Sequence, residues 1–371
     1  MSIDWDGLET AGVFDPKHEN AMERRELIEF LAGEGATTDA IIAAHQADEL
    51  ISLASDSHAL SQGSFAVAEL AELSGFPQGI VEDLYAVIGV PVLDLENKRF
   101  DQSDVRFLTN LADGPASIFE ISELAEMMRV FGTSLARIAD ASVSMFAQGI
   151  EQRMVAQGAT EVELARMQVE AQVQAENLPD IIRLILRHHM VASIRRSRDS
   201  MAAADGLGAR VCVGFVDVVG FTPMSESLDS EALAELVSTF ENRSTDVVTR
   251  HGGQVLKHLG DEVMFLAVDP IVACTVALAL VADFEAQGVK PHGGLTLGTT
   301  VTRRGDYYGP TVNLASRLVN HAVPGEVLVN HELVESLENE SGLVFVPAGR
   351  RMIRGVTEPV RVWTLTIADG D

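Results

Sequence analysis

Two aspartates stand out because each lies where an apolar run is interrupted. Asp217 is at the centre of VCVGFVDVVGF, a run that breaks at Gly220. A carboxylate in such a run is costly to bury unless it has a partner, a hydrogen bond or a metal ion. Asp261 follows 44 residues later, in KHLGDEVMF. Taken alone, each aspartate is equally well explained as a residue that caps a turn or a helix.

The chain around these aspartates alternates between strand-like and helix-like stretches. The segments, in order, are RVCVGFVDVV (strand), SEALAELVSTFENRSTDVVTRHG (helix), GQVLKHLGDEVMFLAV (hairpin), DPIVACTVALALVADFEAQG (helix) and HGGLTLGTTV (strand). The hydrophobic periodicity of each segment, and the glycines at which segments end or turn, support these assignments. A β-α-β-β-α-β order predicts a ferredoxin-like α+β core, an antiparallel sheet with helices packed on one face.

This order brings the hairpin tip at Asp261 beside the end of the strand that carries Asp217. Two carboxylates that converge at a sheet edge hold divalent cations by oxygen ligation. Two such cations stabilise the attacking and leaving oxygens of a phosphoryl displacement. The pair therefore predicts metal-assisted phosphoryl chemistry.

The first 200 residues differ in pattern and charge. They read as almost entirely helical, and the small-residue segment SMAAADGLGA follows them as a linker. Residues 1–180 hold 32 Asp and Glu against 10 Lys and Arg, whereas residues 181–200 hold five arginines and one aspartate. Such a reversal marks a segment with a role of its own. The apolar stretch from Leu124 to Ile150 suits a helical core or a fatty-ligand pocket, and the core is favoured.

Composition bounds the class of protein. With 371 residues, 47% of them hydrophobic, the chain is globular and long enough for two or three domains. Its two cysteines lie in apolar runs, which indicates reduced core residues. No signal peptide or membrane-length apolar segment is visible, so we expect a cytoplasmic protein without a membrane span. The net charge of −28 argues against general nucleic-acid binding.

The C-terminal half resembles the class III nucleotide cyclases. FVDVVGFT and KHLGDEVMF match the family's two metal-aspartate motifs, and GDYYGPTVNLASRL matches its third motif. The resemblance covers residues 210 to about 366. Together with the acidic helical N-terminal half, it is similar to mycobacterial cyclases of the class IIIc type. It implies a helical regulatory domain (1–180), a linker helix and hinge (181–208) and a catalytic domain (209–371).

The resemblance implies roles at matching positions. Asp217 and Asp261 would bind two Mg²⁺ or Mn²⁺ ions in each active site. Lys257 and Asp306 would read the base, and a lysine donor with an aspartate acceptor matches N1 and N6 of adenine, which makes ATP the expected substrate.

Further positions have implied roles in the same family. Asn313 would orient the ribose, and Arg317 would meet the charge that develops around the α-phosphate. Substrate contacts are also implied at four positions: Gly220, Phe221, Thr222 and Arg354. Pro310 departs from the polar residue that many relatives carry, so we expect altered loop rigidity there and no loss of activity.

The resemblance implies an adenylate cyclase that forms cyclic AMP and pyrophosphate from ATP. In this family the metal-binding and base-reading residues act from opposite subunits, and this chain carries both sets, so a homodimer is implied. The alternatives are a catalytically silent nucleotide-binding regulator, a guanylate cyclase, and a DNA-binding regulator that uses the helix-turn-helix-like residues 64–91. The last is disfavoured because residues 77–88 contain no Lys or Arg.

The arginine-rich segment around His188 and His189 is a candidate regulatory element. Histidine is the side chain that normally changes charge between about pH 5 and 8. We therefore expect the full chain to show a pH dependence that residues 205–371 alone lack. A lipid, a small metabolite and a protein partner remain open as signals for the first 200 residues.

Overall fold

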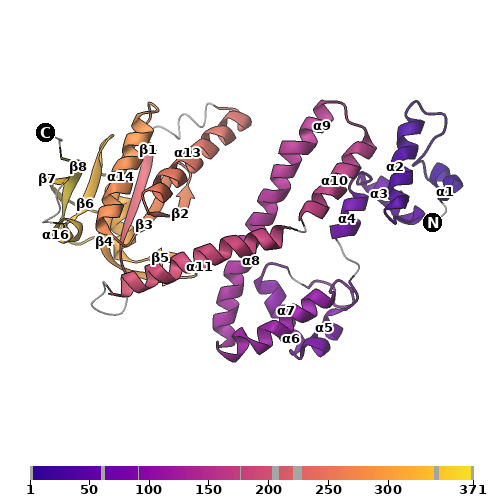
Figure 1. Ribbon diagram of the computed structural model, residues 1–371, viewed down its shortest axis with the longest axis horizontal. Coiled ribbons are helices and arrows are strands. Elements are labelled where there is room, and N and C mark those ends of the chain that lie inside the picture. Colours follow the sequence, from indigo (N-terminus) through magenta and orange to yellow (C-terminus); the bar gives the residue numbers. More distant parts are fainter. Residues whose placement is uncertain are drawn as a thin grey trace. The chain divides into compact units, whose positions relative to one another are not determined.

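The computed structural model describes residues 3–59, 63–90, 92–175, 177–202, 209–219, 228–337 and 342–368. The chain divides into two compact units, Met1–Leu186 and Arg187–Asp371. Figure 1 shows helices in the first unit and a sheet with its covering helices in the second. The helical N-terminal half and the α+β C-terminal half predicted from the sequence are therefore both present.

The helices of the N-terminal half enclose two separate apolar cores. One core lies among the first four helices and α10, and the other among α5 to α8. The elements are α1 (Trp5–Thr10), α2 (Ala21–Gly33), α3 (Thr38–Ala47), α4 (Leu53–Ala59), α5 (Val67–Ser74), α6 (Gln78–Val87), α7 (Gln102–Asp113), η1 (Pro115–Ser117), α8 (Ile121–Phe146), η2 (Ala147–Glu151), α9 (Gln152–Ala156), α10 (Glu161–Ala175) and α11 (Leu178–Ala202). Among the described helices, none has the length and apolar character needed to cross a membrane.

The helix-turn-helix anticipated from the sequence is formed by α5 and α6. Gly75 ends α5 with a φ of +77°, a conformation that glycine adopts without steric cost. The second helix buries Val81, Leu84 and Tyr85 in the core. The Tyr85 hydroxyl donates a hydrogen bond to Asp104 of α7 at 2.5 Å. The inward face of α6 is thus used for packing within the unit.

The apolar stretch of α8 departs from the expected core. Its buried residues are Leu124, Met128 and Gly132, all in the first half of the helix. Further along, Val143 is 68% exposed and Met145 is 73% exposed. The core interpretation is therefore wrong for the second half of α8 within a single chain.

The C-terminal unit is built on a sheet with strand order β2-β3-β1-β4-β6-β8-β7, with β5 paired to β4. Its first four strands are antiparallel and follow the ferredoxin-like order, and β6 then extends the sheet by a parallel pairing with β4. The elements are β1 (Ala209–Val219), α13 (Ser230–Arg250), β2 (Gln254–Leu259), β3 (Glu262–Ala267), α14 (Pro270–Glu285), β4 (Lys290–Arg303), β5 (Asp306–Tyr308), α15 (Pro310–Val319), β6 (Val327–Asn330), α16 (His331–Ser336), β7 (Leu343–Arg351) and β8 (Val360–Ile367).

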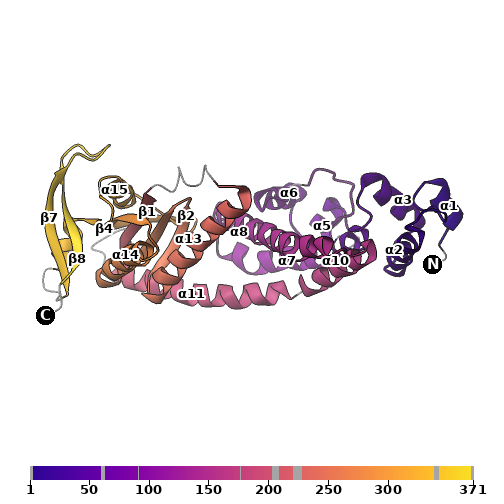
Figure 2. The same cartoon turned by 90° about the horizontal axis from the view of Figure 1, so that it is seen from above.

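Helices cover both faces of this sheet. The helices α13 and α14 pack on one face, as Figure 1 shows, and bury the larger core. The helix α15 lies on the opposite face, visible from above in Figure 2, over a second core that contains Phe215 and Ala315. At Gly294 of β4, an added Cβ would lie 2.3 Å from the Ala315 carbonyl oxygen, so glycine lets α15 approach the sheet closely. The expectation of helices on one face thus holds for α13 and α14 but not for α15.

Candidate active site

A row of three polar side chains crosses the sheet near the end of β1. Asp217 pairs with Glu262 of β3 on one side and with His292 of β4 on the other. Directly opposed residues of antiparallel strands project from the same face, so the three side chains share the α15 face. Asp261 precedes Glu262 in the β2–β3 turn, where Gly260 has a φ of +71°. The structure therefore places the two predicted metal aspartates in neighbouring elements.

Burial and the charge of Asp217 act together on two neighbouring carboxyl groups, those of Asp261 and Glu262. Burial raises the pKa of Asp261, and the charge of Asp217 raises it further. Burial also raises the pKa of Glu262 to about 7, with added contributions from Asp217 and Asp261. A divalent cation between such oxygens would relieve this repulsion, and carboxylate oxygens are the ligands that Mg²⁺ and Mn²⁺ prefer. The donor set thus fits the expected cations.

The side chains that the structure describes supply only some of the ligands that a divalent cation takes. Within the described ranges, no group of three or more His, Cys, Asp and Glu side chains is arranged to hold a metal ion. Mg²⁺ in nucleotide enzymes is usually bound by one or two carboxylates together with waters and substrate phosphates. Asp217 and Asp261 match that pattern.

The sequence pattern does not distinguish His292 or Glu262 as site residues. His292 Nε2 lies 3.3 Å from Asp217 Oδ2, and its Nδ1 lies 3.0 Å from the carbonyl oxygen of Ala322. The hydrogen bond to Asp217 is the largest cause that raises the pKa of His292. The alternation of a strand predicts which residues share a face, but the register that aligns His292 with Asp217 is set by pairing between distant segments.

The predicted base-reading residues form a direct ion pair. Lys257 Nζ lies 2.6 Å from Asp306 Oδ2. Burial acts to raise the pKa of Asp306, but the hydrogen bonds from Lys257 and from the Tyr307 amide outweigh it, so the pKa is lowered. Asp306 is therefore a carboxylate that accepts hydrogen bonds.

A β-bulge turns Lys257 to the face that carries Asp217. Val255 pairs with Phe265 and Lys257 with Met264, so two residues of β2 oppose one of β3. Regular alternation would direct Lys257 to the face of Val255, beneath α13 and α14. The bulge instead places it beside Met264, in the α15 face.

The helix α15 carries the two predicted catalytic residues. Pro310 is its first residue, a position where proline is favoured because its fixed φ suits the first helical turn. Asn313 is exposed and Arg317 is half-buried. An added Cβ at Gly355 would lie 3.1 Å from the Arg317 guanidinium, so Arg317 lies against the loop that also carries the exposed Arg354.

Five of the predicted site residues are not placed at this site by the structure. Gly220, Phe221 and Thr222 lie outside the described residues. His188 and His189 are exposed on α11, immediately after the division between the two units.

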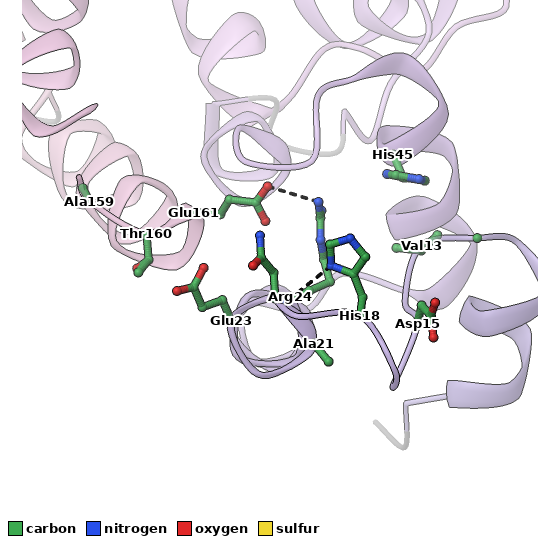
Figure 3. Close-up of a pocket in the computed structure, with 12 residues that line it drawn as sticks. Val13, Asp15, His18, Ala21, Glu23, Arg24, His45, Ala159, Thr160 and Glu161 are labelled. Atoms are coloured by element: carbon green, nitrogen blue, oxygen red, sulfur yellow. Dashed lines mark hydrogen bonds and ion pairs between the residues drawn. The ribbon is translucent and has the colours of Figure 1, made fainter. Parts of the chain in front are cut away.

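The N-terminal unit contains a separate polar cleft of about 340 Å³. Figure 3 shows His18, Glu23 and Arg24 at this cleft, with Glu161 at the start of α10 facing them. The Arg24 guanidinium donates a hydrogen bond to Glu161 at 3.1 Å, which ties α2 to α10. The backbone amide of Asn20 donates a hydrogen bond to His18 Nδ1 at 3.2 Å. This charged lining does not suit a fatty ligand.

Part of the C-terminal unit matches a family model, and both units have relatives of similar sequence. Residues 288–366 match the model described as the adenylate and guanylate cyclase catalytic domain. An uncharacterized protein of Mycobacterium tuberculosis strain H37Rv is 29% identical over 367 residues, which cover 98% of this chain and 94% of that protein. The similarity to this relative therefore includes both units.

Other relatives have named activities. An adenylate cyclase of Streptomyces coelicolor is 33% identical over 243 residues, or 65% of this chain and 63% of that protein. A pH-sensitive adenylate cyclase of M. tuberculosis strain CDC 1551 is 28% identical over 362 residues, which cover 92% of this chain and 87% of that protein. The crystal structure of the adenylyl cyclase CyaB from P. aeruginosa matches 44% of this chain and 95% of its own, with 27% identity and a TM-score of 0.36.

Proposed function

We propose that this chain, a member of the class III cyclase family, converts ATP to 3′,5′-cyclic AMP and pyrophosphate. The observation that carries the proposal is the Lys257–Asp306 pair, 2.6 Å apart, with Lys257 on the sheet face that also carries Asp217. Adenine presents an acceptor at N1 and a donor at N6, which a lysine and a carboxylate complement. Guanine presents the reverse polarity, so ATP is the favoured substrate.

The remaining residues would act on the ribose and the phosphates. Asp217 and Asp261 would hold two Mg²⁺ or Mn²⁺ ions; when bound, these cations would lower the pKa of the ribose 3′-hydroxyl and bind the triphosphate. The 3′-oxygen attacks the α-phosphorus in line, and pyrophosphate leaves. Asn313 would orient the ribose, and Arg317 would stabilise charge at the α-phosphate through its planar, permanently charged guanidinium. Arg354 would contact the departing phosphates.

We further propose that two copies of the chain share each site, one supplying the metal aspartates and the other supplying the base-reading and phosphate-contacting residues. A monomer is then inactive. Exposed apolar side chains along α8 and α11 support an association of two chains, because such stripes are unusual on a monomer. On α11 they are Ile181, Leu184, Ile185, Leu186, Met190, Val191 and Ile194.

Product identification tests the reaction directly. The purified chain is incubated with ATP or GTP and Mn²⁺, and the products are separated and identified. Cyclic AMP formed in preference to cyclic GMP is the expected result. A preference for cyclic GMP would overturn the substrate assignment, and the absence of either product would favour a silent nucleotide-binding domain.

Base reading gives a second measurable outcome. In the variant with Lys257→Glu and Asp306→Cys, we expect kcat/KM for ATP to fall by about 10²-fold or more, because buried donors and acceptors would be mispaired with adenine. Initial rates with ATP and with GTP provide the measurement.

A surface ion pair on α13 supplies the matched control for that variant. Arg250 and Asp246 also lie 2.6 Å apart but are more exposed, so Arg250→Glu with Asp246→Cys should leave the ATP rate within about twofold. An unchanged ATP preference in the Lys257 and Asp306 variant would show that these residues lie away from the base.

Regulation by the arginine-rich end of α11 is a further proposal. Protons added at His188 and His189 would increase like-charge repulsion in this helix and alter how it packs. We expect the variant with both histidines replaced by asparagine to have a flatter pH profile of turnover than the wild-type chain. His251→Asn, at an exposed histidine after α13, should leave the pH profile of turnover unchanged. Superimposable profiles for the wild-type chain and the His188/His189 variant would contradict the proposal.

A further inference from the structure

His292 is held between a metal aspartate and the segment that follows α15. Its Nε2 faces Asp217 Oδ2 at 3.3 Å, and its Nδ1 faces the Ala322 carbonyl oxygen at 3.0 Å. The His292 side chain is 13% exposed, compared with 31% for Asp217. The ring is therefore mostly enclosed, while the carboxylate stays open to a ligand.

The backbone on both sides of His292 is fixed by hydrogen bonds. The Gly325 amide donates to the Pro291 carbonyl at 2.7 Å, and the Gly293 amide donates to the Glu326 carbonyl at 2.8 Å. The Ala322 amide donates to carbonyl groups in the last turn of α15, each at 3.1 Å. Hydrogen bonds therefore hold both the backbone that carries the His292 ring and the Ala322 carbonyl group that Nδ1 contacts.

We propose that His292 is a positioning residue for the metal ligand Asp217: the anchored ring holds Oδ2 and thereby directs Oδ1 toward the cation. This inference rests on the proposed role of Asp217. Among the described residues, Asp217 has a side-chain hydrogen-bond partner only in His292. A carboxylate whose rotamer is fixed before binding loses less conformational entropy when it takes a cation.

Two amide variants separate the contact to Asp217 from the contact to Ala322. The side-chain nitrogen of glutamine reaches the place of Nε2, whereas that of asparagine reaches the place of Nδ1. His292→Gln therefore keeps a donor for Asp217, and His292→Asn keeps only the donor for Ala322. Both variants are uncharged and polar, so they serve as matched controls for each other.

The measurement is Mn²⁺ binding by the full chain without nucleotide. The electron paramagnetic resonance signal of free Mn²⁺ reports how much of the cation is unbound. We expect His292→Asn to weaken Mn²⁺ binding by about tenfold, the range found when a residue that orients a metal ligand is lost, and His292→Gln to stay within about threefold of wild type. In turnover assays, the Mn²⁺ concentration for half-maximal rate should rise in the asparagine variant, while kcat at saturating Mn²⁺ largely recovers. Melting temperatures show whether both variants are folded.

Equal Mn²⁺ affinity of the asparagine and glutamine variants, at any level, would overturn the inference. So would magnetic coupling between Mn²⁺ and an imidazole nitrogen in the wild-type chain, because the ring would then bind the cation and not the carboxylate. Asp217→Ala distinguishes a failure of the underlying proposal. If that variant binds Mn²⁺ as the wild type does, the cation site itself is misassigned.

Discussion

Replacing Asp217 or Asp261 by alanine is expected to lower turnover by about 10³-fold or more, while the fold and the association of chains persist. A catalytic cation contributes several kcal/mol of transition-state stabilisation, and each 1.36 kcal/mol is about a tenfold change in rate. Both aspartates are only partly buried, and neither belongs to an apolar core. The loss should therefore be specific to catalysis. Initial rates with ATP and Mn²⁺ and the elution volume of each variant provide the measurement.

Thermal unfolding without cations gives an independent check of the same site. Burial and the charge of Asp217 raise the pKa of Asp261, so its carboxylate is held under electrostatic repulsion. Asp261→Ala should leave the melting temperature unchanged or raise it, as often happens when a functional residue is removed.

Asp246→Ala, on the exposed face of α13, is the control for turnover and should retain the wild-type rate. Substantial turnover in either metal-site variant would contradict the two-cation assignment.

The periodicity of the sequence is enough to predict the central sheet but not its surroundings. The β-α-β-β-α-β order is confirmed in β1 to β4 with α13 and α14, because strand alternation, apolar helices and glycine turns are local signals. The parallel pairing of β6 with β4, and α15 on the opposite face, depend on contacts between distant segments. No local pattern encodes them.

The same limit applies to the residues of the site. Asp217 and Asp261 are conspicuous because each interrupts an apolar pattern. His292 and Glu262 join them only through strand register, and Lys257 reaches its face only through a bulge in β2. In α8, the pattern predicts an apolar face but not what covers it, and within one chain Val143 and Met145 are left exposed.

Mixing two inactive variants is expected to restore activity if two chains share each site. Asp217→Ala chains keep Arg317, and Arg317→Ala chains keep Asp217. In a mixed dimer, one site would combine the intact Asp217 of one chain with the intact Arg317 of the other, and the second site would carry both substitutions. After random exchange in an equal mixture, half of the dimers are mixed and half of their sites are intact, so about a quarter of wild-type activity is expected.

The control for this experiment uses two variants from the same half of the site. Asp217→Ala mixed with Asp261→Ala should stay inactive, because each site takes both metal aspartates from one chain and every chain lacks one of them. Exchange of subunits is verified with differently tagged chains recovered in one complex. A mixture of Asp217→Ala and Arg317→Ala that remains inactive after verified exchange would show that the model in which Asp217 and Arg317 act from opposite chains is wrong. Recovery in the control mixture would show instead that Asp217 and Asp261 act from different chains, since only then would exchange reunite them.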